Sequence, residues 1–217
     1  MRLVAAIHPP EATTAILECL GLPARAPPER LRLEPLAPGH AGALHRIYAE
    51  PGVADLLFTR PRSREEFASA FDRALRFGET HGMWAVFARG REALLGRVGF
   101  FAFGEEKRPE LVFLLSRSAW GRGLATEACA RALEHAVRSR PWSEVVALVR
   151  PGNVAAVRVV EKVGFAPESD LLFGGEEARL YRASRSRIEA WRPTSGRSGP
   201  DVRRDPKSAR AKADQVG

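Results

Sequence analysis

The chain of 217 residues is 45% hydrophobic and 28% charged, the composition of a soluble globular protein. Its formal net charge is +8, but nine basic and four acidic residues lie after position 183, so that segment alone carries +5. The rest of the chain is only mildly basic, which gives no reason to expect a nucleic-acid-binding surface beyond weak contacts of the last segment.

Cysteine usage and hydropathy exclude two further classes. Cys19 and Cys129 form neither a disulfide framework nor a metal-ligand spacing, so we expect no metal. No apolar run approaches the roughly 18 residues of a membrane span, and acidic and proline residues interrupt the first 21 positions where a signal peptide needs an apolar core. We therefore expect a cytoplasmic protein without membrane contact.

Changes in composition divide the chain into three parts. Residues 1–29 are predicted to be an N-terminal appendage that ends in a proline-rich linker. Residues 30–183 carry the strand and helix patterns of one domain. Residues 184–217 are polar and rich in Arg, Gly and Pro, and we expect them to be disordered.

Within residues 30–183, apolar periodicity predicts an alternation of strands and helices. The strands are expected at residues 30–36, 83–88, 94–103, 110–116, 144–149, 166–173 and 178–182. The helices are expected at residues 41–48, 63–77, 124–139 and 154–163. Closely spaced strands with tight turns favour antiparallel pairing, whereas the strand–helix–strand unit over 110–149 should be parallel and right-handed. The fold class is therefore mixed α/β.

The turn over residues 118–126 lies between an apolar strand and a helix. Helix N-termini carry unpaired backbone N–H groups, and they bind anions, phosphates above all. Gly121 and Gly123 allow close approach of a ligand to the backbone, and Arg122 adds a positive charge. A plain turn that uses glycine only for its geometry is the alternative.

Two separated motifs resemble the GCN5-related N-acetyltransferase (GNAT) superfamily, in particular its branch that acetylates the N-termini of ribosomal proteins. Trp120-x-x-Gly123-x-Ala125 is similar to the superfamily's acetyl-CoA motif, and the stretch from Pro151 to Phe165 is similar to its second signature. The likeness spans about residues 30–183. It implies a mostly antiparallel sheet of six to seven strands with flanking helices, in which one parallel strand pair splays apart.

The resemblance also implies roles for individual residues. The pyrophosphate of acetyl-CoA would lie against the turn and first helical residues, and its pantetheine arm would lie between the splayed strands. The residues implied to bind it are Leu114, Leu115, Trp120, Gly121, Arg122, Gly123, Leu124, Ala125, Thr126 and Asn153. A backbone N–H near Leu114 or Leu115 would hold the thioester oxygen. Glu110 is the candidate general base, with a solvated strand-end glutamate as the alternative. Asn153 would either cap its helix or also face the arm.

The chain departs from the superfamily pattern at two positions. Many members carry a general-acid tyrosine where this chain has Val160, and a serine of the second signature is replaced by Ala156. The proton for the departing thiolate would then come from water or from another hydroxyl group.

The sequence therefore predicts an acetyl-CoA-dependent N-acetyltransferase that acts in a ternary complex, as a monomer or homodimer. The acceptor is a primary amine, either a protein N-terminus or a small molecule, and is expected between the helices over 41–77 and the final hairpin. Two alternatives remain open. One is a CoA-binding regulatory or ribosome-associated module without turnover, and the other is an unrelated phosphate-binding α/β fold.

Residues 5–28 carry a separate resemblance, to the extreme C-terminal end of transposases of rolling-circle-type insertion sequences. This likeness covers under 30 residues and contains no catalytic motif. It gives no reason to expect transposition.

Overall fold

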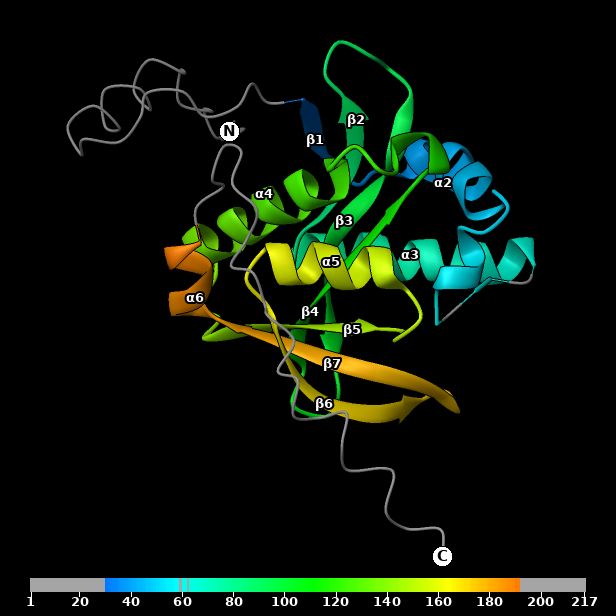
Figure 1. Ribbon diagram of the computed structural model, residues 1–217. Helices are drawn as coiled ribbons and strands as arrows, with labels where there is room; N and C mark the ends of the chain where they lie inside the picture. Colours follow the sequence, from blue (N-terminus) through cyan, green and yellow to red (C-terminus); the bar gives the residue numbers. More distant parts are fainter. Residues whose placement is uncertain (1–29, 59, 62, 192–217) are drawn as a thin grey trace, which may run out of the picture.

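A computed structural model describes residues 30–58, 60–61 and 63–191 of the protein (Figure 1). The predicted appendage over residues 1–29, with its transposase resemblance, lies outside the described residues. The part of the predicted tail beyond residue 191 does so too.

Seven strands form one sheet in the order β1-β2-β3-β4-β5-β7-β6. Their bounds are β1 (Leu31–Pro35), β2 (Met83–Ala88), β3 (Leu94–Phe103), β4 (Arg108–Leu115), β5 (Glu144–Val149), β6 (Ala166–Phe173) and β7 (Glu176–Ser184). All neighbouring strands are antiparallel except β4 and β5, which are parallel. This confirms the predicted mixed, mostly antiparallel sheet with one parallel pair.

Five α-helices and three 3-10 helices connect the strands of the described chain. They are η1 (Pro38–His40), α2 (Ala41–Tyr48), η2 (Ala54–Leu56), α3 (Arg64–Thr80), η3 (Arg117–Ala119), α4 (Leu124–Ser139), α5 (Val154–Lys162) and α6 (Arg185–Ala190). Helix α3 begins where the Ser63 side chain accepts a hydrogen bond of 3.1 Å from the Glu66 amide, as its capping spacing predicts. It runs three residues further than the pattern indicated.

The helices form a layer on each face of the sheet, α4 and α5 on one face and α2 and α3 on the other (Figure 1). Two apolar clusters fill the spaces between these layers. The larger one joins α4 and α5 to the sheet and includes Leu111 and Leu115 of β4. The smaller one joins α2 and α3 to the sheet and includes Leu114. Alternate residues of β4 thus contact opposite layers, as strand geometry requires.

The expectation of disorder from residue 184 onward is wrong for residues 184–191, the part of that segment that the structure describes. Ser184 caps α6 by accepting a hydrogen bond from the Arg187 amide, and Ile188 is buried. The Arg185 guanidinium donates to the carbonyl oxygens of Val137 and Arg140, at the C-terminal end of α4. The polar composition of this segment did not indicate a helix. The helix packs on the domain through one arginine and one isoleucine, which are too few to produce an apolar pattern.

The parallel strands β4 and β5 pair at one position only, where Glu110 lies beside Val146. By contrast, β4 pairs with β3 over eight consecutive positions. Beyond Glu110, toward their C-terminal ends, β4 and β5 are not paired with each other. We call this unpaired stretch of the two strands the opening; because the strands are parallel, it lies at the end from which both α4 and α5 begin.

Candidate active site

The turn between β4 and α4 has a backbone that glycine allows at two positions. Gly121 and Gly123 have φ angles of +70° and +73°, in the left-handed region that other residues rarely adopt. Gly123 is the N-cap of α4, and no side chain caps the helix there. The first backbone bond of the helix runs from the Glu127 amide to the Gly123 carbonyl oxygen.

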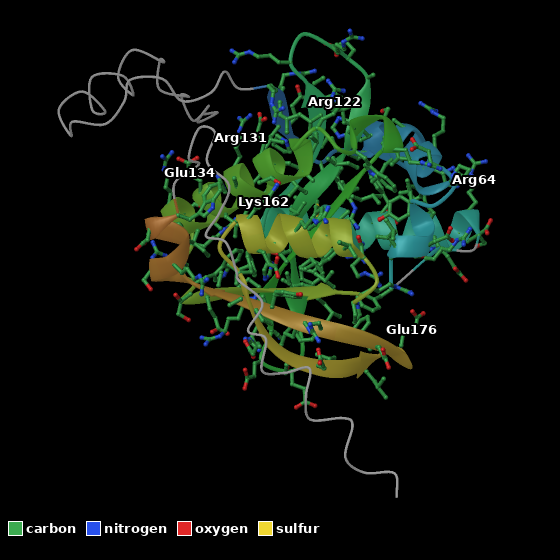
Figure 2. All side chains as sticks on the ribbon, viewed as in Figure 1. Arg64, Arg122, Arg131, Glu134, Lys162 and Glu176 are labelled. Carbon is green, nitrogen blue, oxygen red and sulfur yellow. The ribbon has the colours of Figure 1, made fainter. Side chains whose placement is uncertain are left out.

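The amides of Leu124, Ala125 and Thr126 therefore have no acceptor among the described residues. Unpaired amides of this kind, together with the helix dipole, favour an anion at a helix N-terminus. Arg122 extends from the same turn and is exposed (Figure 2).

Arg30, just before β1, forms hydrogen bonds with this turn and with the first turn of α4. Its guanidinium donates to the Arg122 carbonyl oxygen at 2.8 Å, and its Nε donates to the Glu127 carboxylate at 2.8 Å. The Glu127 carboxylate also accepts from the backbone amides of Arg30 and Leu31. The first turn of α4 is thus fixed to the edge of the sheet.

Glu50 contacts the same turn from the other side, a role that no sequence motif indicates. Its carboxylate accepts hydrogen bonds from the Arg117 amide at 2.8 Å and from the Ser116 hydroxyl at 3.2 Å. The Arg117 guanidinium also donates to the Pro51 carbonyl oxygen. Glu50 belongs to no motif, since it lies two residues after the end of α2 and meets the turn only in the folded chain.

Trp120 joins the turn to the end of β4. Its indole Nε1–H donates a hydrogen bond of 2.8 Å to the Leu115 carbonyl oxygen, while 40% of the residue remains exposed. The Arg117 guanidinium lies 5.8 Å from the centre of the indole ring. Leu115 is the last residue of β4, and the Trp120 side chain binds its carbonyl oxygen.

The register of β3 and β4 separates the two leucines that the sequence proposed for the thioester oxygen. The Ser116 amide donates to the Leu95 carbonyl oxygen at 2.8 Å, and Leu115 lies opposite Gly96. Hydrogen-bonded and free positions alternate along an antiparallel pair, so the Leu115 amide points away from β3 and the Leu114 amide points toward it. Leu115 is thus the residue of the two whose N–H faces the opening beside β5.

Glu110 lies at the closed end of that opening, on the face of the sheet covered by α2 and α3. It is half-buried, and Phe101 of β3 is its cross-strand neighbour. Burial raises the pKa of the Glu110 carboxyl to about 7, against smaller lowering effects of the Arg97 charge and the Leu148 amide. A carboxyl with this pKa exchanges its proton near neutral pH.

Arg97 is a second residue of this face that the motifs did not include. Its guanidinium donates to the Tyr48 hydroxyl at 2.8 and 3.2 Å and lies 5.4 Å from the centre of the Phe101 ring. Within the described part of the chain no carboxylate lies within ion-pair distance of it. An arginine in an otherwise apolar strand pattern was the signal that could have singled it out.

The second signature forms the start of α5 and part of the core. The Asn153 side chain accepts a hydrogen bond of 3.0 Å from the Ala156 amide, so it caps the helix. Val160 is fully buried in the larger apolar cluster, and Ala156 packs against that cluster. Neither position offers a proton donor.

The described residues contain no group of three or more His, Cys, Asp or Glu side chains placed to hold a metal ion. None of the helices that the structure describes has the length and hydropathy to cross a membrane. Cys129 is buried, and burial raises the pKa of its thiol, which makes it an unreactive core residue.

The fold and the turn together define an N-acetyltransferase of the GNAT type. The acetyltransferase (GNAT) domain family matches residues 30–166. The chain belongs to this family.

Three known proteins illustrate what the chain is similar to. The uncharacterized N-acetyltransferase p20 of Bacillus licheniformis is 24% identical over 157 residues, which cover 70% of this chain and 86% of p20. The uncharacterized protein YkkB of Bacillus subtilis is 31% identical over 84 residues, so this match spans 38% of the chain and about half (49%) of YkkB. A GNAT-family acetyltransferase structure from Bordetella pertussis superposes with a TM-score of 0.64 at 24% identity, covering 73% of this chain and 98% of that one.

Proposed function

We propose that the protein transfers an acetyl group from acetyl-CoA to a primary amine by direct attack in a ternary complex. The opening between β4 and β5 is the observation that carries this proposal. At one end of this opening lies the N-terminus of α4, which we propose binds an anion. At the other end lies the Glu110 carboxyl group, whose pKa is about 7.

The residues of the turn fit a pyrophosphate, because their unpaired amides and Arg122 offer donors and positive charge to it. The residues proposed to hold acetyl-CoA are Leu115, Trp120, Gly121, Arg122, Gly123, Leu124, Ala125 and Thr126. The pantetheine arm would lie along the unpaired edges of β4 and β5. Asn153, at the start of α5, flanks the same opening, and we keep a contact with the arm as part of the proposal.

The Leu115 amide supplies the donor for the thioester oxygen. In the transfer, the amine nitrogen bonds to the acetyl carbon, the carbon–sulfur bond breaks, and the sulfur leaves as a thiolate, which takes up the proton that the nitrogen releases after attack. An N–H that faces the opening stabilises the charge that develops on the oxygen. Of Leu114 and Leu115, Leu115 is the residue whose amide direction fits this role.

Glu110 acts as the base. Free amino groups titrate at about 8 to 10.4, so at neutral pH the acceptor arrives mostly protonated. A carboxyl with a pKa of about 7 is largely ionised just above neutral pH and can take that proton. A thiol has an ordinary pKa of about 8.5, so its thiolate can leave without a strong acid. The absence of a proton donor at Val160 therefore does not stop the reaction.

The acceptor is a primary amine, either a protein N-terminus or a small molecule. Structures of a spermidine N-acetyltransferase from Vibrio cholerae and of a ribosomal L7/L12 α-N-protein acetyltransferase superpose with TM-scores of 0.62, each at 18% identity. At that identity the likeness concerns the fold.

A CoA-binding module without turnover is the second candidate. Val160 and Ala156 occupy the positions where the superfamily often has a tyrosine and a serine, and their side chains cannot donate a proton. Two measurements separate the candidates. Thermal shift should show stabilisation by CoA well above that by ATP, and thiol release from acetyl-CoA should require an added amine. Stabilisation by CoA without thiol release from any amine or N-terminal peptide would favour the module. Equal stabilisation by ATP would remove the CoA site itself.

A further inference from the structure

Four phenylalanines lie on or beside the face of the sheet that carries Glu110, which is the face opposite α4 and α5. We call them the phenylalanine surface: Phe58, Phe101, Phe103 and Phe173. Phe101 lies directly across from Glu110 in the β3–β4 register, and Phe103 projects from the same face two residues further on.

The other two rings close this surface from the side. Phe173, at the end of β6, lies 6.4 Å from Phe103 and 5.5 Å from Phe58, measured between ring centres. Phe58 belongs to the segment between α2 and α3, so the surface joins that segment to the final hairpin. All four rings are half-buried or exposed, which leaves apolar area open to a ligand.

Arg150 fastens the same two segments together. Its guanidinium donates to the Leu57 carbonyl oxygen at 2.9 Å, forms an ion pair with Glu176 at the hairpin turn, and stacks on Phe58 at 5.0 Å. Figure 2 shows Glu176 at the hairpin end, on the same side of the molecule as Arg64 at the start of α3. The phenylalanine surface is therefore held by contacts between side chains of the described chain.

The other carboxylates on this side of β4–β7 are neutralised by arginines. Glu144 and Glu168 each form ion pairs with Arg108 and Arg182, and Glu176 pairs with Arg150. Glu110, by contrast, has no basic side chain within ion-pair distance among the described residues. The surface thus offers one site for one ammonium group.

A second ammonium group would meet positive charge here. Arg97 lies close enough to Glu110 to lower its pKa, and Arg150 flanks Phe58. Like charges in a partly desolvated site repel, and this would cost binding of a polyamine. An apolar or aromatic group beside the amine would instead cover the exposed rings.

We infer that the acceptor is a monoamine whose amino group adjoins an aromatic or bulky apolar group, with the ammonium at Glu110 and the apolar group on the phenylalanine surface. This inference rests on the proposed function. It excludes polyamines as the preferred acceptors, as well as peptides that begin with a small polar residue.

The test compares acceptors at equal concentration with the full chain and acetyl-CoA, with thiol release as the signal. The acceptors are 2-phenylethylamine, ethylamine, spermidine and a tetrapeptide beginning with serine. We expect kcat/KM for 2-phenylethylamine to exceed that for each of the others by at least about tenfold, the effect of burying roughly two methylene groups. A faster reaction with spermidine or the peptide would overturn the inference and leave the proposed function intact.

A pair of variants tests whether the preference for 2-phenylethylamine arises at the phenylalanine surface. Phe173→Ser should raise KM for 2-phenylethylamine about tenfold and leave ethylamine unchanged. Leu172→Ser is the matched control, because Leu172 is the adjacent residue, is 72% exposed and points to the other side of β6. Equal effects of the two variants, or none from Phe173→Ser, would contradict the inference.

If no amine is acetylated, the proposed function fails, but the inference is still decided by binding. Saturation-transfer NMR of 2-phenylethylamine with the CoA-bound protein should show contact of the phenyl ring that Phe173→Ser weakens. Absence of contact would overturn the inference as well.

Discussion

The Trp120 indole donates a hydrogen bond of 2.8 Å to the carbonyl oxygen of Leu115, so one side chain joins the end of β4 to the turn that precedes α4. The contact brings two parts of the proposed cofactor site into a fixed relation. The Leu115 amide faces the opening beside β5, and the turn presents the unpaired amides of α4. A change in this bond should therefore alter cofactor binding before it alters chemistry.

Trp120→Phe keeps an aromatic ring and removes the donor. We expect KM for acetyl-CoA to rise about fivefold to tenfold, because the loss of one hydrogen bond costs about 1 kcal/mol. Steady-state kinetics at saturating amine measures this. Trp142→Phe is the control, since Trp142 packs against Phe100 away from the turn and should change thermal stability without changing KM. An unchanged KM in Trp120→Phe would show that the bond does not position the site.

Glu50→Ala removes the acceptor for the Arg117 amide and the Ser116 hydroxyl. The turn then loses its support from the segment after α2, and we expect a several-fold higher KM for acetyl-CoA with kcat within about twofold of the original value. Glu92→Ala is the matched control, because the Glu92 side chain is 97% exposed. A fall in kcat with unchanged KM would instead place Glu50 in the chemical step.

Val160→Tyr restores the residue type that many superfamily members use as the acid, and we expect it to harm this protein. Val160 is fully buried in the larger apolar cluster, so the added ring must displace neighbours, at a cost of about 1–3 kcal/mol in the free energy of unfolding. Denaturant unfolding measures the loss, and Val154→Tyr at an exposed position of the same helix should cost much less. A gain in kcat without loss of stability would show that the position can host an acid.

Much of the fold followed from the sequence because its signals are local. Glycines, prolines and capping residues such as Ser63 and Asn153 mark element ends, and alternation marks strands. The parallel pair followed from a strand–helix–strand unit. Helix α6 did not, because its docking depends on Arg185 reaching carbonyl oxygens of α4, some 45 residues away in sequence.

The site divides in the same way. The turn from Trp120 to Thr126 is contiguous in sequence and could be proposed as a unit. Glu50, Arg30 and Arg97 come from distant elements, and only the folded chain shows that they support or face it. The pKa of Glu110 likewise depends on burial under segments far from it in sequence.

The pH dependence of acetyl transfer tests the central claim most directly. If Glu110 takes the proton of the amine, kcat/KM should rise about tenfold per pH unit below about 7 and level off above it, because the ionised carboxylate is the active form. Glu110→Gln should lower kcat/KM at pH 7.5 by about a hundredfold or more and abolish the inflection near 7, whereas Glu106→Gln in the exposed β3–β4 turn should change neither. Full activity of Glu110→Gln, with the inflection retained, would contradict the account.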